Sequence, residues 1–257
     1  EINLNNKKKI HNLLKVRKPD VVFHLAANNP SFHEKDIQKF YKVNFKITKN
    51  LFNEKFKRNP KAKFIFCSSS RIFQKTYGVV NEKSKFLSRD HYSKFRIEIN
   101  NFSNKIRNNN KNFKFINAIL FNHDSVYRSK KFLLPRIVKN LLDNNTIFLN
   151  KIMRENIAMD YSHADDICNG LIKLIFIKKN INNIILSSGK KTYVNDIIKY
   201  LIKKNKLKIN LNNRLKTNKS CLVGNNNFAK KYLNWKIKKN IFLAAQELFL
   251  NAKNTKY

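Results

Sequence analysis

Residues 18–27 read Lys-Pro-Asp-Val-Val-Phe-His-Leu-Ala-Ala, and this stretch decides the fold class. Its apolar residues follow one another instead of alternating with polar ones, which is typical of a strand buried on both faces of a parallel sheet. Residues 63–68 (Lys-Phe-Ile-Phe-Cys-Ser) and 113–121 (Phe-Lys-Phe-Ile-Asn-Ala-Ile-Leu-Phe) have the same character. The sequence therefore predicts three buried strands.

Helical patterns separate these strands. In residues 40–52 apolar side chains recur at spacings of three and four, and residues 92–106 repeat the pattern from Phe95 to Ile106. Such spacings gather apolar side chains on one face of a helix. Strands that alternate with helices predict an α/β fold with a Rossmann-type parallel sheet. Further helices are predicted at residues 10–15, 132–142, 165–177, 194–203 and 241–251, and further strands at residues 146–149 and 184–187.

The charge of the chain is strongly positive. Lys and Arg number 54 against 16 Asp and Glu, for a formal net charge of +38. Such a charge ordinarily indicates a nucleic-acid partner. However, the lysines are spread evenly and accompany an excess of Asn, Ile and Phe, the joint bias that an AT-rich genome encodes. With no zinc finger, RNP-like strand or KH-type loop in the sequence, we do not expect nucleic acid to be a partner.

The cysteines and the apolar runs exclude further classes of protein. The three cysteines, Cys67, Cys168 and Cys221, form no C-x-x-C pair, which disfavours a disulfide scaffold and a zinc ribbon. We expect three buried thiols in a reducing cytoplasm and no metal site. No apolar run approaches the roughly 20 residues of a membrane span, so no membrane partner is expected.

Glycine usage raises a question about the cofactor. A Rossmann-type sheet usually binds a dinucleotide at a G-x-G-x-x-G loop after its first strand. The only glycines here are Gly78, Gly170, Gly189 and Gly224, so the sequence contains no such loop. We therefore expect an N-terminally truncated Rossmann-type domain that lacks its first βαβ unit.

Several segments occur in an order that is typical of one enzyme family. They are residues 18–27, Val43-Asn44, residues 66–70 (Phe-Cys-Ser-Ser-Ser), Asn81-Glu82, Phe86 and Tyr92. Together they resemble the extended short-chain dehydrogenase/reductase family, the NAD(P)-dependent nucleotide-sugar epimerases and dehydratases. Three further segments resemble the GDP-mannose 4,6-dehydratase subgroup in particular. They are residues 119–125 (Ile-Leu-Phe-Asn-His-Asp-Ser) with Arg128 and Phe132, residues 160–166, and residues 222–224 through 233–236.

The resemblance covers essentially the whole chain and implies two domains. Residues 1–122 would form the incomplete NAD(P)-binding domain. Residues 123–257 would form mainly the substrate-binding domain, with residues 157–178 returning to the first. The implied cofactor is NADP or NAD, and the implied partners are a nucleotide sugar, with GDP-mannose favoured, and further copies of the chain in a homodimer or tetramer.

The resemblance also assigns catalytic roles. In this family a Tyr takes a proton from a sugar hydroxyl, a Lys four residues later supplies positive charge on the same helix face, and a Ser or Thr hydrogen-bonds the reacting oxygen. By position these are Tyr92 and Ser69, and Arg96 occupies the Lys position. Tyr127, Tyr200 and Tyr232 are also followed by Lys four residues later, so the place of Tyr92 between the strands is what singles it out.

A second departure bears on the reaction type. The dehydratases have a Glu two residues after the catalytic Ser or Thr, and this chain has Arg71 there. A guanidinium is a poor base near neutral pH, so elimination of water would need Glu82 or another carboxylate.

The remaining site assignments concern the two ligands. Asn122 and Ser69 would contact substrate, and His24 is expected to be a packing residue. The residues expected to bind the cofactor are Leu25, Ala26, Ala27, Tyr92, Arg96, His123 and Arg128.

The favoured function at this point is a GDP-mannose 4,6-dehydratase-like lyase, weak or inactive as this chain stands. One alternative is an epimerase or 4-keto reductase of the same family, which needs no Glu at position 71. Another is a non-catalytic degenerate paralogue or a basic binding module.

Overall fold

The computed structural model describes residues 2–27, 37–110, 113–212, 216–217 and 221–255. The chain forms two compact units: unit 1 comprises Glu1–Gln74, Glu82–Leu120 and Ile172–Ile185, and unit 2 comprises Lys75–Asn81, Phe121–Leu171 and Leu186–Tyr257. The segment that returns to unit 1 is therefore 172–185, whereas we expected 157–178. Residues 75–81 belong to unit 2, which the sequence did not predict.

Unit 1 is built on a four-stranded sheet. Its strands are β1 (Val21–His24), β2 (Lys63–Ser69), β4 (Phe115–Leu120) and β7 (Asn183–Leu186), in the order β1-β2-β4-β7. β1 pairs with β2, and β2 with β4, in parallel. The four strands predicted in this part of the chain and the parallel α/β fold are confirmed, although β1 ends at His24.

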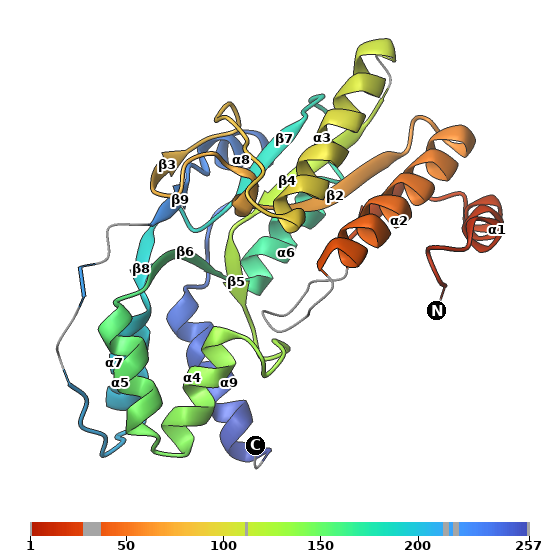
Figure 1. The fold of residues 1–257 in the computed structure, drawn as a ribbon. Helices are drawn as coiled ribbons and strands as arrows, with labels where there is room; N and C mark the ends of the chain where they lie inside the picture. The colour runs from red at the N-terminus through yellow and green to blue at the C-terminus, as the bar shows by residue number, and fades with distance from the viewer. Residues whose placement is uncertain (1, 28–36, 111–112, 213–215, 218–220, 256–257) are drawn as a thin grey trace. The chain divides into compact units, whose positions relative to one another are not determined.

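Three helices of unit 1 lie side by side, as Figure 1 shows: α1 (Lys7–Arg17), α2 (Ile37–Arg58) and α3 (His91–Asn109). Their apolar faces share one core with β2 and β4, so the predicted helical patterns are confirmed. Phe52 of α2 makes edge contacts with Phe64 and Phe115, with ring centroids 5.4 Å and 5.8 Å away. The core residues are Ile10, Leu14, Leu51, Phe52, Phe64, Phe66, Phe95, Ile99, Phe113 and Phe115.

Unit 2 combines helices with two small sheets. Helices α4 (Leu133–Leu142), α7 (Val194–Lys204) and α9 (Ile241–Asn254) supply most of its core. One sheet has the order β5-β6-β8 and the other pairs β3 with β9. These strands are β3 (Gly78–Val80), β5 (Asn122–Asp124), β6 (Ala158–His163), β8 (Lys191–Tyr193) and β9 (Leu222–Gly224), and the other helices are α5 (Thr146–Glu155), α6 (Ala164–Lys173) and α8 (Asn227–Leu233).

The predicted strand at residues 146–149 is wrong, because these residues begin α5. The Asn145 side chain caps the helix by accepting a hydrogen bond from the Phe148 amide at 3.1 Å. Leu149 and Met153, four residues apart, are both buried on one face of the helix. A short apolar run cannot by itself distinguish a strand from the first turn of a helix.

The cysteines also differ from expectation. Cys221 is buried, but Cys67 is half-buried and Cys168 is exposed; all three lie in the described residues, and none forms a disulfide. Within the described ranges, no three or more His, Cys, Asp or Glu side chains gather as a metal site would require. None of the described helices combines the length and apolar character needed to cross a membrane.

Candidate active site

The carboxyl ends of the parallel strands meet at one edge of the unit 1 sheet. His24 at the end of β1 lies opposite Phe66, and Ser69 at the end of β2 lies opposite Leu120. In open α/β sheets this edge is where ligands bind. Leu25 follows β1 here with 63% of its surface exposed, and it provides an apolar surface at this edge.

His24 is a packing residue, as predicted. It is 3% exposed, its ring lies against Phe64 and Phe66, and its Nε2 lies 2.8 Å from the Thr48 hydroxyl oxygen. Burial, with a smaller contribution from Arg96, lowers the pKa of His24 to about 4. The ring is therefore neutral at physiological pH, and it supports the end of β1 by packing against its neighbours.

Ser69 ends β2 and begins the short 3₁₀ helix η1 (Ser70–Ile72). Its hydroxyl accepts a hydrogen bond from the Arg71 amide at 3.3 Å, and the side chain is half-buried. A serine favours such a position because its short side chain can satisfy an amide at a helix start. Among the described residues the hydroxyl only accepts, so its proton can be donated to a reacting oxygen.

Tyr92 lies in the first turn of α3. Asp90 caps this helix: its carboxylate accepts from the Ser93 amide at 2.7 Å, and the Ser93 hydroxyl accepts from the Asp90 amide at 3.2 Å. This reciprocal capping fixes the helix start. Tyr92 is half-buried and meets the edge of the Phe95 ring at a centroid distance of 6.3 Å.

Arg96 follows Tyr92 by one helical turn, and the two side chains share a face of α3. The guanidinium carbon lies 3.8 Å from the centre of the Tyr92 ring, so the cation is stacked on the ring face. Arg96 is only 4% exposed, and its Nε has no hydrogen-bond partner among the described residues. Burial lowers the pKa of Arg96. Arginine guanidiniums keep their proton in proteins, so the side chain carries a positive charge.

Arg71 approaches the same tyrosine from η1. Its guanidinium carbon lies 5.6 Å from the centre of the Tyr92 ring, and it donates a hydrogen bond to the Asp90 carboxylate. Burial alone would raise the pKa of Asp90, but hydrogen bonds from Ser93 and the charge of Arg71 lower it. Two guanidiniums therefore approach one phenol ring, and one of them is neutralised by a carboxylate.

Glu82, the carboxylate considered as a substitute for the missing Glu, is engaged elsewhere. One of its oxygens accepts a hydrogen bond from the Ile185 amide at 3.0 Å, in β7. Burial raises the pKa of Glu82, with the backbone hydrogen bonds opposing the rise. Its contact with β7 favours a structural role.

The site residues predicted in unit 2 lie around β5. Asn122 is exposed and donates to the Asp160 carbonyl at 3.4 Å. The His123 Nδ1 donates to the Phe121 carbonyl at 2.8 Å, and burial lowers the pKa of His123. Arg128 places its Nε 2.8 Å from the Asp124 carboxylate and its guanidinium carbon 3.6 Å from the centre of the Phe132 ring.

Unit 1 thus brings together Ser69, Arg71, Tyr92 and Arg96 near its sheet edge. Unit 2, taken by itself, carries Asn122, His123 and Arg128 on and after β5. The sequence did not single out Asp90 or the Asp124–Tyr161 hydrogen bond. The spacing of Asp90 and Ser93 before an apolar helical pattern is the capping signal that could have found the former. The Asp124–Tyr161 hydrogen bond joins β5 to β6, which are distant in the sequence, so no local sequence pattern predicts it.

The residues present suit one half of a nicotinamide dinucleotide. Leu25, which is exposed at the sheet edge, with Ala26 and Ala27 offers an apolar surface to a flat ring, and the hydroxyls of Ser69 and Tyr92 offer polar contacts. The Gly-rich loop that would hold the diphosphate is not among the 257 residues. The chain therefore fits the nicotinamide end of the cofactor.

A parallel sheet packed against helices, with polar side chains at the carboxyl ends of its strands, defines a Rossmann-like α/β protein. A family model supports this assignment and makes it specific. The chain belongs to the NAD dependent epimerase/dehydratase family, whose model matches residues 1–184.

Solved structures agree on the fold. RMD from Pseudomonas aeruginosa, complexed with NADPH, is 14% identical with a TM-score of 0.85, covering 99% of this chain and 87% of that one. UDP-glucose 4-epimerase from Thermotoga maritima, with UDP-glucose, is 16% identical with a TM-score of 0.81, covering 100% and 84%. dTDP-glucose 4,6-dehydratase from Bacillus anthracis, in complex with NAD, is 15% identical with a TM-score of 0.80, covering 100% and 79%.

One curated protein matches a short part of the sequence. D-erythronate dehydrogenase from Haemophilus influenzae is 46% identical over 54 residues, which are 21% of this chain and 17% of that protein. The match therefore spans less than a fifth of that relative's length.

Proposed function

We propose that the protein is an NAD(P)-dependent enzyme that oxidises or reduces a nucleotide sugar at C4, as an epimerase or a 4-keto reductase does. The observation that carries this proposal is the group around Tyr92. A phenol, the Ser69 hydroxyl at the end of β2 and a buried cation stacked on the phenol ring supply what proton transfer at a sugar oxygen requires.

The residues would divide the work as follows. Tyr92 would take a proton from the C4 hydroxyl in oxidation, or give one to the C4 oxygen in reduction, while Ser69 donates a hydrogen bond to that oxygen. Arg96, 3.8 Å from the ring centre, would stabilise the negative charge that develops on the phenol when its proton leaves. NAD or NADP, when bound along Leu25, Ala26 and Ala27, would supply the hydride chemistry.

Arg71 favours this reaction over dehydration. Elimination of water needs a base near C5 of the sugar, and in the family that base is a Glu at the position of Arg71. Here the position holds a guanidinium that is ion-paired with Asp90, and Glu82 is hydrogen-bonded to the Ile185 amide of β7. Epimerisation and 4-keto reduction need no such base.

A GDP-mannose 4,6-dehydratase is the second candidate. The resemblance of residues 119–125, with Arg128 and Phe132, to that subgroup supports it, as do the roles proposed for His123 and Arg128 in NADP binding and for Asn122 in substrate binding. The protein would then need a different group to remove the C5 proton.

Substrate choice separates the candidates. The purified protein is incubated with NADPH and a 4-keto nucleotide sugar, with NAD and UDP-glucose, and with NADP and GDP-mannose. The products are separated by anion-exchange chromatography and identified by NMR, because C4 epimers have the same mass. We expect turnover of the first or second mixture. A 4-keto-6-deoxy product from GDP-mannose would instead establish the dehydratase. No turnover in any mixture, with an intact fold, would establish the non-catalytic alternative.

We also propose that the protein acts in the cytoplasm as a homodimer or tetramer. The absence of a disulfide among its three cysteines supports the compartment, and the family resemblance supports the assembly, which light scattering would measure.

A further inference from the structure

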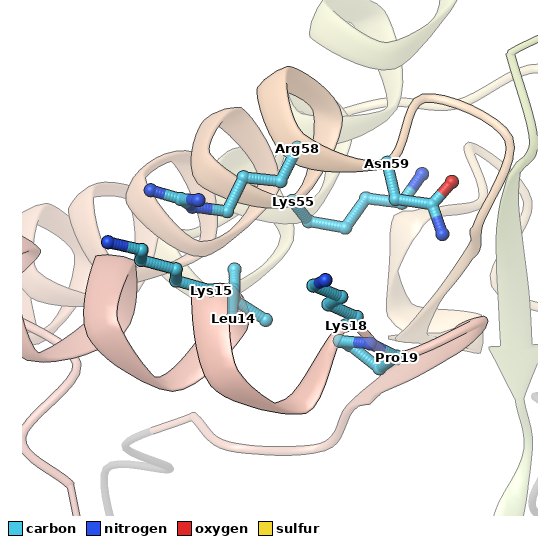
Figure 2. A pocket seen from close by; sticks show the side chains of 7 residues that line it. All are labelled: Leu14, Lys15, Lys18, Pro19, Lys55, Arg58 and Asn59. Atoms are coloured by element: carbon cyan, nitrogen blue, oxygen red, sulfur yellow. The ribbon is translucent and has the colours of Figure 1, made fainter.

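A cavity lies at the other end of unit 1 from Tyr92. It has a volume of about 240 Å³ and lies between the last turns of α1 and α2, where Leu14 and Lys15 face Lys55, Arg58 and Asn59 (Figure 2). Lys18, which follows α1 just before β1, also lines it. The cavity is therefore at the amino edge of the sheet, away from the carboxyl ends of the strands.

The lining is cationic. Four of its side chains are Lys15, Lys18, Lys55 and Arg58, and none of the lining residues is acidic. Figure 2 shows the Lys18 side chain reaching into the space between the helices. Lysines and arginines are common at helix carboxyl ends because of the helix dipole, and this accounts for exposed cations such as Lys15. It does not account for a buried one.

Lys55 is that buried cation. Its side chain lines the cavity with 2% of the residue exposed, and its Nζ has no hydrogen-bond partner among the described residues. Burial, and then the charge of Lys114, lowers the pKa of Lys55 to about 8. Glu54, its neighbour on α2, is hydrogen-bonded to His11 at 3.2 Å. A buried ammonium without an acceptor is costly, so a counter-ion at this place would stabilise the fold.

We propose that this α1–α2 cavity binds a phosphate group, with Lys18 and Lys55 as its main ligands and with Lys15 and Arg58, whose charged ends point outward in Figure 2, at its rim. Pockets for drug-sized ligands span roughly 300–1,000 Å³. The cavity is smaller than that, so it suits inorganic phosphate or one phosphate group of a nucleotide. The site is distinct from the catalytic group and does not depend on the proposed function.

The test compares phosphate binding by the wild-type chain with that by Lys55→Met and Lys57→Met. Lys57 is exposed in the same helical turn and does not line the cavity. Its variant therefore loses one positive charge, as Lys55→Met does, but leaves the cavity unchanged. Binding of inorganic phosphate is measured by calorimetry, and thermal unfolding is followed with phosphate or chloride at equal ionic strength. This matching matters because a chain of net charge +38 responds to any anion.

We expect one phosphate per chain in the wild type and in Lys57→Met, and about tenfold weaker binding or more in Lys55→Met, as the loss of one charge-assisted hydrogen bond implies. A second variant, Lys18→Met, should also weaken phosphate binding. Because Lys18 is exposed, this variant tests the site even if Lys55→Met does not fold. Equal binding by Lys55→Met and Lys57→Met, or no saturable binding, would overturn the proposal. A parallel titration with ADP identifies the source: tighter binding than phosphate, lost in Lys55→Met, indicates a nucleotide, and weaker binding indicates the free ion.

Discussion

In unit 2 the buried Asp160 carboxylate is fully engaged, whereas in unit 1 two buried cations are not. Asp160 accepts hydrogen bonds from the Ser188 amide and hydroxyl, both at 2.7 Å, and from the Gly189 and Gly224 amides, both at 3.1 Å. Arg96 and Lys55 each carry a nitrogen with no hydrogen-bond partner among the described residues. The difference teaches that these buried charges are satisfied differently: the Asp160 carboxylate holds loops of unit 2 through their amides, whereas Arg96 and Lys55 of unit 1 keep donors for which we propose ligands.

Asp166 repeats the unit 2 pattern. Its carboxylate accepts from the Lys238 and Lys239 amides at 3.0 Å and 2.7 Å, and its carbonyl accepts from the Trp235 indole at 2.8 Å. The chain has only 16 acidic residues, and these buried ones bind backbone amides instead of cations. Asp124, also buried in unit 2, is instead ion-paired with Arg128.

The largest expected effect concerns the catalytic group. Tyr92→Phe should lower kcat/KM for the turned-over nucleotide sugar by about 100-fold or more, because general acid–base catalysis contributes roughly 10²–10⁴-fold. The free energy of unfolding should stay close to that of the wild type. Steady-state kinetics are compared with Tyr127→Phe, a matched change at a tyrosine that is 94% exposed and also followed by Lys four residues later. Equal activity in the two variants would remove Tyr92 from the mechanism.

The next effect concerns the fold of unit 2. Asp160→Asn should lower the free energy of unfolding by about 3 kcal/mol, because the new amide NH₂ would face amides that now donate to the carboxylate. Urea denaturation measures this change. The control is Asp165→Asn, an exposed carboxylate paired with Lys239, which should cost about 1 kcal/mol or less. If Asp160→Asn lowers the free energy of unfolding no more than Asp165→Asn does, the structural role of the buried carboxylate is contradicted.

A smaller effect concerns pH and His24. The folded pKa of about 4 lies below the ordinary value of 6.5, so the unfolded chain binds the proton first as pH falls. The stability that His24 contributes is present above pH 6.5 and is lost as pH falls towards 4, by about 2–3 kcal/mol between pH 7 and 4.5. In urea denaturation, the free energy of unfolding of His24→Gln should fall less steeply with decreasing pH than that of the wild type. His11→Gln is the control. Parallel declines in the wild type and His24→Gln would show that His24 is not the group responsible.

The sequence predicted the parts of the fold that local patterns control. The continuous apolar runs gave β1, β2 and β4, and the spacing of Phe95 and Ile99 gave α3. It also placed Tyr92 and Arg96 on one helix face, because residues four apart in a helix are neighbours. The run at residues 146–149 failed, since its helical character depends on the Asn145 cap and on burial of Leu149 and Met153.

Contacts between distant parts of the chain were beyond the sequence. The Arg71–Asp90 ion pair joins residues 19 positions apart, and Glu82 meets Ile185 across 103 positions. The α1–α2 cavity needs two helices to be packed before Lys55 can be recognised as buried. Such features depend on tertiary packing, and composition offers no substitute: the +38 charge did not indicate which cations would be buried without partners.

The most direct test of the difference between the units is the free energy of unfolding of Arg96→Met, measured in urea beside Asp160→Asn. If Arg96 is placed for a ligand, removing this buried charge, whose Nε has no partner among the described residues, should leave stability within about 1 kcal/mol of the wild type or raise it, because an apolar residue of similar size often replaces a buried charge without loss. Turnover should fall at the same time. A loss of stability as large as that of Asp160→Asn, with turnover unchanged, would contradict the account.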